Sequence, residues 1–354
     1  MSGRAPTIYD VAELAGVGRT TVSRVLNGER KVKAATRDRV LNAVTQLRYK
    51  VNPQARLLAG GRAHTLMLVY PACDDHGPFS WYNLLIESGA QRGCAEAGLQ
   101  LTINRVFPDS LHRLDRVLKP LQDMACDGVI LSPPFSDDPE LIAALKARHM
   151  PVACLAAGPE TRELAAGIGM DDEGAGFDLT NYLLKLGHRR FAFILGLKEH
   201  ISAGERFEGF CRALRAAGLS PADVPTFRGT LNYSSGVEQM QSIIDSGFRP
   251  TAVVCANDEM AVGALYRAHQ VGLAVPRDMT VVGFDDAPFA SMVWPPLTTI
   301  VQPIYTMAQK AAEVILHQIE GRPQRYELTP HRLVVRDSAA APTYPVLAID
   351  AGAA

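Results

Sequence analysis

The sequence lacks the patterns that mark exported, membrane-spanning or disulfide-rich proteins. Its 6 cysteines are widely spaced and form no CxxC pair, which favours buried free thiols over a metal site or disulfides. The longest stretch without a charged residue, 287–309, contains four prolines, which exclude a bilayer-spanning helix. The N-terminal run MSGRAPTIYD has no apolar core of the kind that a secretory signal needs. These absences predict a cytoplasmic protein that does not associate with membranes.

The sequence also lacks the common signatures of enzymes. It contains no GxSxG nucleophile elbow, no Walker loop and no HExxH pair. The run GIGMDDEG has too few glycines for a dinucleotide-binding fingerprint. Asp171 and Asp172 are adjacent, and neighbouring carboxylates do not flank a glycosidic bond from two sides. We therefore predict that the protein is not an enzyme and that it needs no cofactor and no metal ion.

Charge is asymmetric along a chain whose composition is otherwise ordinary. The 354 residues predict two to three domains, and 47% hydrophobic with 21% charged residues is typical of globular proteins. Residues 1–62 hold 12 Lys and Arg against 4 Asp and Glu, a net charge of +8, which leaves −9 for the remainder. This distribution favours a small head that binds a polyanion. A solvated pair of basic helices would give the same charge pattern.

Three short helices are predicted in the basic head. Thr7 is suited to cap the first helix, with Asp10 at its third position, and Gly16 ends it. A second helix is predicted over 19–26 and a third over about 35–47. Apolar residues of the second helix recur at helical spacing, so they pack inward and leave a polar face outside. The short turn between the first two helices predicts a helix-turn-helix.

The second helix of such a motif lies in the major groove of DNA, where its first residues meet base edges. Arginine matches the O6 and N7 acceptors of guanine, while hydroxyl, amide and ammonium groups hold phosphates. We predict base contacts from Arg19, Thr20 and Arg24, and phosphate contacts from Thr7, Ser23, Asn27 and Lys31. The alternative is an exposed polar helix face without a ligand.

A short fourth helix is predicted after the head. Asn52 provides a cap, Pro53 suits the first turn, and helix-favouring residues continue until Gly60. An isolated helix of this length is marginal in water, so it should order only against DNA or a second copy of itself. Its candidate DNA-contact residues are Asn52, Ala55 and Leu58. Leu58 is suited to wedge between base pairs in a minor groove, although a plain linker leucine is the alternative.

The N-terminal region contains, in order, the runs TIYDVAELAGVGRTTVSRVLNG, TRDRVLNAVTQLRY and VNPQARLLAGG. The rest of the chain contains LGHRRFAFILG, SAGERFEGF, ANDEMAVGAL, TVVGFDD and PPLTTIVQP. In order and spacing these runs resemble the LacI/GalR family of bacterial transcription regulators over nearly the whole chain. The resemblance implies a homodimer, or a tetramer built as a dimer of dimers, on a palindromic operator in double-stranded DNA. It also implies a sensor core like that of periplasmic sugar-binding proteins.

Two residues of the head depart from the family pattern. Gly18 stands where most members have a serine that caps the recognition helix and touches a phosphate. Glycine is an acceptable cap, so Gly18 keeps its place among the DNA-binding candidates, but the hydroxyl contact is lost. Lys33 replaces a usual serine cap before the third helix. Neither change threatens the fold.

After residue 62, short apolar runs alternate with helical stretches, which is typical of parallel strands with crossover helices. The fold class predicted is a small all-α helix-turn-helix head plus an α/β body with two lobes. The first lobe is expected to hold strands over 66–70, 99–104, 128–132 and 151–155, and the second over 166–169, 191–195, 252–256 and 280–284. The predicted divisions are a DNA-binding domain (1–50), a hinge helix and linker (51–62), an effector-binding and dimerisation domain (63–340) and a flexible tail (341–354).

Polar turns follow several of the predicted strands, at the edge where ligands of such sheets bind. Carboxylates and amides accept from adjacent hydroxyls, arginine donates to them, and an aromatic ring covers the apolar face of a sugar. By resemblance, Arg206, Asn257, Asp285 and the segment around Phe79 match effector-contact positions. The effector-binding candidates are Asp74, Phe79, Trp81, His200, Ser202, Arg206, Asn257 and Asp285. Asp258 and Asp286 are better read as helix caps.

Taken with the resemblance, the sequence predicts a repressor of carbohydrate-utilisation genes, released from a palindromic operator by a small sugar-like effector. The alternative is a corepressor-dependent repressor or an activator with a non-sugar effector such as a purine. Ala156 and Leu231 stand where relatives often carry a polar residue and an aromatic ring. Effector specificity therefore does not transfer from the family.

Overall fold

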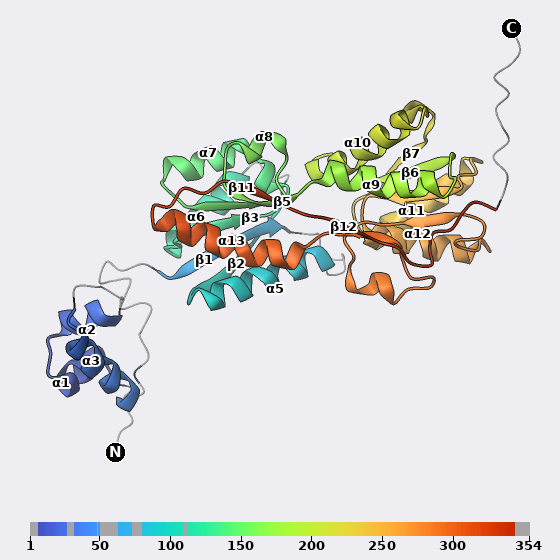
Figure 1. The fold of residues 1–354 in the computed structure, drawn as a ribbon. Helices are drawn as coiled ribbons and strands as arrows, with labels where there is room; N and C mark the ends of the chain where they lie inside the picture. The colour runs from blue at the N-terminus through green and yellow to red at the C-terminus, as the bar shows by residue number, and fades with distance from the viewer. Residues whose placement is uncertain are drawn as a thin grey trace, which may run out of the picture. The chain divides into compact units, whose positions relative to one another are not determined.

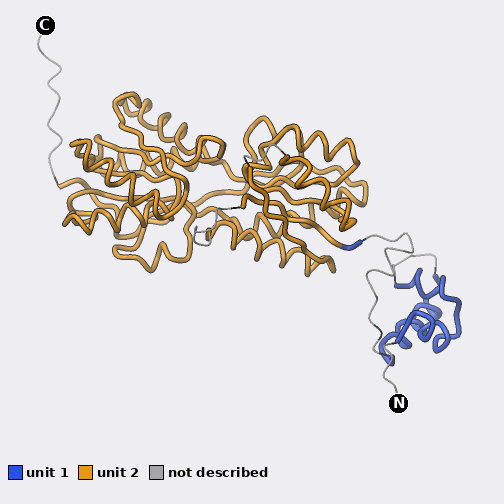
Figure 2. Tube along the Cα trace, turned by 180° about the vertical axis from the view of Figure 1, so that it is seen from behind, with its two compact units in different colours: residues 1–64 blue, residues 65–354 orange. Residues whose placement is uncertain are grey.

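The computed structural model describes residues 6–26, 32–47, 49, 63–72, 80–108 and 112–343. The chain divides into two compact units, residues 1–64 and 65–354 (Figure 2), here called the head and the body. The helix predicted over 52–60 and residues 344–354 of the predicted tail lie outside the described residues.

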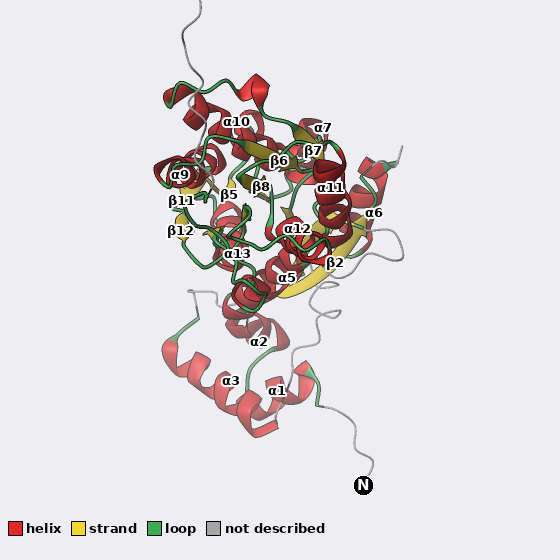
Figure 3. Ribbon diagram, turned by 90° about the vertical axis from the view of Figure 1, so that its right-hand side faces the viewer, coloured by secondary structure: helices red, strands yellow, loops and turns green. Residues whose placement is uncertain are grey.

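The head contains three helices, α1 (Ile8–Ala15), α2 (Arg19–Leu26) and α3 (Ala34–Leu47) (Figure 3). Their inward faces bury a small apolar core made of Val11, Ala12, Ala15, Val22, Val25, Val40 and Ala43. The core residues of α2 recur at helical spacing, which leaves the other face of this helix to solvent. The predicted helix-turn-helix is confirmed.

Local chemistry sets both ends of α1. The backbone N–H of Thr7 donates to Asp10 Oδ2 at 2.6 Å, so the carboxylate of the first turn satisfies a backbone donor just before the helix. Gly16 ends the helix with a φ of 61°, a left-handed conformation that glycine adopts without strain. These contacts hold the start of α1 and the turn into α2.

The first lobe of the body is a six-stranded parallel sheet in the order β11-β5-β4-β3-β1-β2 (Figure 1). In chain order, the strands are β1 (Thr65–Pro71), β2 (Gln100–Val106), β3 (Gly128–Leu131), β4 (Val152–Leu155), β5 (Gly167–Met170) and β11 (Tyr326–Thr329). The side chains of alternate residues of β1 point to opposite faces of the sheet. Leu66 and Leu68 share a core with α5 (Trp81–Glu96) and α13 (Ile304–Ile319). Met67 and Val69 share one with α6 (Arg113–Asp123) and α7 (Pro139–Ala147).

The second lobe is a four-stranded parallel sheet in the order β7-β6-β8-β9. Its strands are β6 (Phe191–Leu195), β7 (Thr226–Arg228), β8 (Ala252–Cys255) and β9 (Thr280–Val282). Its helices are α9 (Asp172–Lys185), which packs on α10 (Ile201–Ala216), and α11 (Tyr233–Asp245), which packs on α12 (Asp258–Gln270). A short antiparallel pair, β10 (Thr299–Val301) and β12 (Arg332–Val334), lies beside this sheet. The predicted α/β body with parallel sheets is confirmed.

One strand was placed in the wrong lobe. Residues 166–169 were expected in the second lobe, but β5 pairs with β4 and β11 in the first sheet. Strands of parallel sheets are apolar on both faces, so their composition does not reveal which of two sheets they join. The chain crosses to the second lobe only after β5.

The chain passes between the lobes three times. The crossings follow β5 at residues 170–172, follow β10 at residues 301–304, and join β11 to β12 at residues 329–332. Each lobe is therefore assembled from separate stretches of sequence. Among the described residues, every helix is too short or too polar to cross a bilayer.

Candidate functional site

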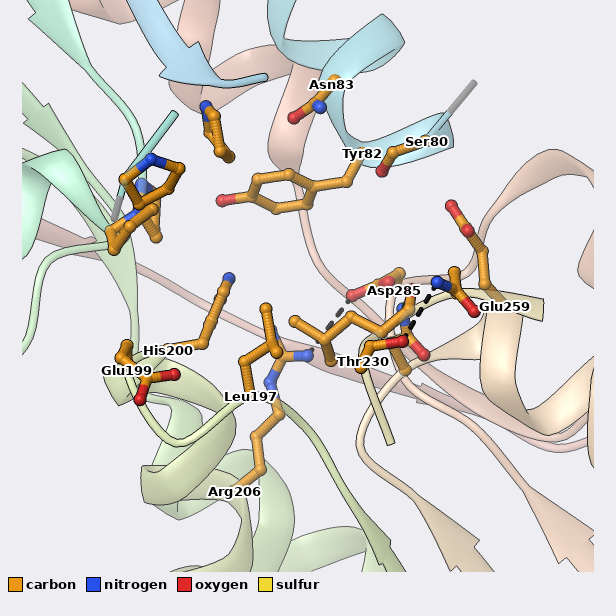
Figure 4. A pocket seen from close by; sticks show the side chains of 17 residues that line it. Ser80, Tyr82, Asn83, Leu197, Glu199, His200, Arg206, Thr230, Glu259 and Asp285 are labelled. Atoms are coloured by element: carbon orange, nitrogen blue, oxygen red, sulfur yellow. Dashed lines mark hydrogen bonds and ion pairs between the residues drawn. The ribbon is translucent and has the colours of Figure 1, made fainter. Parts of the chain in front are cut away.

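A cavity of about 270 Å³ lies between the two lobes of the body (Figure 4). Most of its walls come from turns just past the carboxyl ends of β1, β2, β3, β6, β7 and β8, where an open α/β sheet presents its ligand site. The first lobe contributes Pro71, Ser80, Tyr82, Asn83, Pro108, Pro133 and Pro134. The second contributes Leu197, Glu199, His200, Arg206, Thr230, Leu231, Asn232, Asn257, Glu259 and Asp285.

Arg206 of α10 forms the most heavily bonded part of this lining and is only 5% exposed. Its Nε donates to Asp172 Oδ1 at 2.8 Å, its Nη1 to the carbonyl of Ala256 at 2.7 Å, and its Nη2 to Gln302 Oε1 at 3.1 Å. The guanidinium also lies 3.9 Å from the ring centroid of Phe284. Since Asp172 and Gln302 belong to the first two chain crossings, Arg206 fastens both crossings beside the cavity.

Asp285 lies next to this guanidinium, and one of its carboxylate oxygens accepts no hydrogen bond from the described residues. Its Oδ1 is 3.5 Å from Arg206 Nη1, yet within the described structure this buried oxygen accepts no hydrogen bond. Burial raises the pKa of Asp285 well above its usual value against the opposing charge of Arg206. A buried acceptor without a donor costs roughly 1–3 kcal/mol. A ligand hydroxyl placed here would recover that cost.

His200 faces the first lobe across the cavity as a neutral imidazole. Burial, followed by the charge of Arg206, lowers the pKa of His200 to about 3. Its Nδ1 lies 3.0 Å from Ser202 Oγ, and its ring meets the edge of Tyr82 at a centroid distance of 6.4 Å. The hydroxyl of Tyr82 is buried, and the described residues give it no hydrogen-bond partner. Neutral rings and unsatisfied oxygens suit an uncharged, hydroxyl-rich ligand.

Helix α2 presents the predicted DNA-contact residues on the outside of the head. Arg19, Thr20 and Arg24 are exposed and Ser23 is half-buried, whereas Val22 and Val25 are buried in the head core. Arg19 Nη1 donates to the hydroxyl of Tyr9 at 3.4 Å. The outer face of α2 is therefore polar and positively charged.

Gly18 precedes α2 and accepts from its first turn through the backbone carbonyl, which takes the N–H of Thr21 at 2.9 Å and of Val22 at 3.2 Å. A Cβ built at Gly18 would meet nothing within 4 Å. The serine that the family pattern favours would fit there without a clash. The glycine is thus not required by packing within the head.

Comparison with known proteins matches both units of the chain. Residues 7–52 match "Bacterial regulatory proteins, lacI family", and residues 180–339 match "Periplasmic binding protein-like domain". Catabolite control protein A of Priestia megaterium is 32% identical over 338 residues, 94% of this chain and 98% of that protein. The chain belongs to the lacI family of bacterial regulatory proteins.

Two further relatives of this lacI-family regulator extend the match. The ribose operon repressor of Escherichia coli (strain K12) is 34% identical over 328 residues, 92% of this chain and 97% of that protein. The structure of the Lac repressor dimer bound to operator and the anti-inducer ONPF superposes with a TM-score of 0.80. It is 29% identical and covers 96% of this chain and 100% of that one. The match therefore runs through both the helical head and the two-lobed body.

The cavity of this lacI-family chain brings together four of the eight predicted effector residues, namely His200, Arg206, Asn257 and Asp285. Ser202 is fully buried and contacts His200 instead of lining the cavity. The predicted contact residues that lie outside the described part of the chain are Asp74 and Phe79 in the body and Asn27, Lys31, Asn52, Ala55 and Leu58 in the head.

The aromatic ring that lines the cavity from α5 is Tyr82, whereas Trp81 was expected there. Trp81 is 38% exposed and packs against Phe289 at a centroid distance of 5.9 Å. The side chains of consecutive helical residues point about 100° apart. An error of one position along the helix therefore selects a side chain that faces a different surface. The start of α5 was not anticipated, and with it the direction of either ring.

The caps at the strand ends also differ from expectation. Asn257 is the cap of α12: its Oδ1 accepts from the N–H of Met260 at 3.0 Å, and its Nδ2 donates to the carbonyl of Leu231 at 2.8 Å. Asp258 instead accepts from Thr299 Oγ1 at 2.7 Å. Asp286 pairs with Arg336 rather than capping a helix. Asn257 thus shapes the cavity with both of its polar atoms already bonded.

Cavity residues missed from the sequence include Ser80, Asn83, Glu199, Thr230, Asn232 and Glu259. Glu199 and Glu259 are neighbours of candidates that were named, since each lies within two residues of one. Thr230 and Asn232 follow β7, a strand of three residues that was not predicted. A strand this short leaves too little alternation to be recognised.

Proposed function

We propose that this lacI-family regulator is a cytoplasmic, non-enzymatic repressor of carbohydrate-utilisation genes. As a homodimer it binds a palindromic operator in double-stranded DNA, and a small sugar-like effector in the cavity releases it. The observation that carries this function is a cavity of hydroxyl-binding groups between two lobes, on a chain whose head exposes a basic helix-turn-helix. The named activity of the ribose operon repressor and the operator complex of the Lac repressor support it.

The charge of the cavity favours an uncharged effector over an anionic one. Its described lining has three carboxylates, Glu199, Glu259 and Asp285, against one guanidinium, that of Arg206. Three nitrogens of that guanidinium already donate to protein acceptors. A phosphate or carboxylate would need charge-assisted donors that this lining directs elsewhere. Hydroxyl groups, in contrast, donate to carboxylates and amides and accept from whatever donors remain.

Release of the operator follows from coupling between the two sites. An effector that prefers one separation of the lobes shifts the population of the dimer toward the arrangement with that separation. Because binding free energies are reciprocal, operator DNA must lower effector affinity by the same factor, typically equivalent to ~1–3 kcal/mol. The base contacts proposed are those of Arg19, Thr20 and Arg24.

The experiment combines a thermal-shift screen of neutral sugars, sugar phosphates and purines with an operator selected from a random duplex library. A neutral sugar should raise the melting temperature and weaken operator binding in a titration. A bound ligand that leaves operator affinity unchanged contradicts the proposal. A ligand that tightens operator binding would identify a corepressor-dependent regulator instead.

Asp285→Ala should abolish the effector response while operator affinity stays at the level of the unmodified protein. Asp285 lines the cavity, its Oδ1 is without a hydrogen-bond donor among the described residues, and it lies far along the chain from the head. The control is Lys146→Ala, on α7 and away from the lining. A normal response of Asp285→Ala would mean that the effector binds elsewhere.

A further inference from the structure

The first turn of α5 is bound from the opposite lobe. The backbone N–H of Trp81, in the first lobe, donates to Glu259 Oε1, in the second lobe, at 3.0 Å. Ser80 precedes α5, but its side chain does not cap the helix. A carboxylate 178 positions away along the chain therefore does what a capping residue normally does within one helix.

The side chain of Trp81 contacts the second lobe as well. Its ring lies 5.9 Å from that of Phe289, which belongs to a short 3-10 helix (Pro288–Ser291) of the second lobe. The two rings are tilted by 59°, within the range of favourable aromatic pairs. Backbone and side chain of Trp81 thus both reach across the boundary between the lobes, next to the cavity.

Glu259 is held between the starts of two helices. Glu259 itself lies in the first turn of α12 in its own lobe (Figure 4). Its carboxylate accepts from the backbone N–H of Trp81, in the first turn of α5 in the other lobe. Exposed N–H groups and the helix dipole at each start favour a negative charge. Glu259 is only 9% exposed, so this contact is shielded from solvent. Burial raises the pKa of the carboxyl, and hydrogen bonds from the backbone of Trp81 and the side chain of Ser80 oppose that change.

We propose that Glu259 and Trp81 form a latch that sets the separation of the two lobes beside the cavity. Trp81 is then a positioning residue that holds the lobes, not a stacking surface for the effector. Glu259 also lines the cavity, so a ligand that takes its carboxylate as an acceptor competes with the latch. That last step rests on the proposed function, whereas the latch itself does not depend on the effector or on DNA.

The test compares Glu259→Ala with Glu259→Gln and with Glu199→Ala in the full chain. Only the fluorescence series also carries Trp294→Phe, because Trp81 and Trp294 are the only tryptophans of the chain. Glu199 is a carboxylate of the same lobe and the same cavity, and no bond among the described residues joins it to the first lobe. Hydrogen exchange in the first turn of α5, Trp81 emission and the radius of gyration from solution scattering are measured.

Glu259→Ala should speed exchange at the start of α5 by about tenfold, as expected when a helix loses its cap. It should also shift Trp81 emission to the red and enlarge the radius of gyration. Glu259→Gln should change less, because its amide oxygen still accepts from Trp81. Glu199→Ala should change none of the three. If Glu259→Ala behaves like Glu199→Ala, the latch does not exist.

A second variant distinguishes two roles of Glu259: holding the two lobes together and only capping α5. Ser80→Asp, added to Glu259→Ala, supplies a cap from within the first lobe. The latch requires that slow exchange returns while the radius of gyration and Trp81 emission stay altered. If all three readouts return, Glu259 is only a cap and the proposal is overturned. None of the three readouts uses operator or sugar, so failure of the proposed function would leave this result unchanged.

Discussion

Arg206 shows at the level of single residues how one side chain serves both stability and ligand binding. Its bonds to Asp172 and Gln302 hold two crossings between the lobes, and the same group lines the cavity. Removing one partner of a buried ion pair leaves an uncompensated charge. Loss of Arg206 would leave both Asp172 and Asp285 uncompensated and would unfold or misalign the body. Asp285→Ala leaves Arg206 bonded to Asp172, so Asp285 is the better probe of effector binding.

His200 gives the body a defined response to acid. The folded imidazole stays neutral down to a pKa of about 3, whereas an exposed one has a pKa of 6.5. Between these values the unfolded chain binds more protons, so the stability due to His200 is complete above about pH 6.5 and is lost as the pH falls toward 3. His200→Gln should therefore show a smaller loss of unfolding free energy between pH 7 and 5 in urea titrations.

The control for this measurement is His269→Gln, which changes an exposed histidine of α12. It should reproduce the pH dependence of the unmodified protein. An identical pH dependence for His200→Gln would mean that folding does not lower the pKa of the His200 imidazole.

Arg24→Ala should weaken operator binding by ~1–3 kcal/mol and relax the preference for one base pair in each half-site. Arg24 is exposed in the last turn of α2, and its guanidinium has the paired donors that match the O6 and N7 acceptors of guanine. Binding to a panel of operator variants measures the effect. Lys31→Ala, at a predicted phosphate contact, should instead weaken all sequences alike and lower the salt dependence. A uniform loss for Arg24→Ala would reassign that residue to the phosphate backbone.

At the level of elements, α9 and α10 pack so closely that glycine is required. A Cβ at Gly209 would lie 1.9 Å from the carbonyl oxygen of Glu173 and 2.7 Å from the backbone nitrogen of Phe177. Gly209→Ala should therefore destabilise the body by at least ~1–3 kcal/mol, since backbone cannot move aside cheaply. Thermal unfolding measures this loss.

Gly204→Ala is the matched control on the same helix. A Cβ at Gly204 meets nothing within 4 Å, so this substitution should stabilise α10 by ~0.5–1 kcal/mol. Equal melting temperatures for the two variants would show that the helices separate easily.

The sequence anticipates elements well where their pattern is local, and poorly where partners are distant. The three head helices and seven of the eight predicted body strands lie in the expected unit and lobe. β5 was misplaced because its neighbours β4 and β11 are chosen by tertiary packing. The cavity was located from polar turns after strands. Tyr82 and Trp81 differ only by the phase of α5, and Ser80 was not recognised as the residue before the start of this helix.

At the level of the whole molecule, an exposed apolar pair on the second lobe suits contact with a second copy. Met292 and Trp294 are 80% and 81% exposed. Large apolar side chains this exposed are typical of contact surfaces. Trp294→Asp should therefore shift the dimer toward monomer in sedimentation and weaken operator binding, because one head alone reads half of a palindrome.

The control is Met124→Asp, which places the same charge on a methionine of the first lobe that is 44% exposed. It should leave the sedimentation behaviour unchanged. If Trp294→Asp also sediments as the unmodified protein does, the subunits associate through another surface.

The last strand of the first lobe has a consequence for synthesis on the ribosome. β11 covers the outer edge of β5, and it is made of residues 326–329, near the end of the chain. Until that stretch emerges, β5 remains an open edge, which is a template for pairing with a neighbouring nascent chain. The last helix of the head ends at residue 47, so the head is synthesised long before β11 completes the sheet of the first lobe. A message truncated before codon 326 would thus yield a DNA reader attached to an aggregation-prone body.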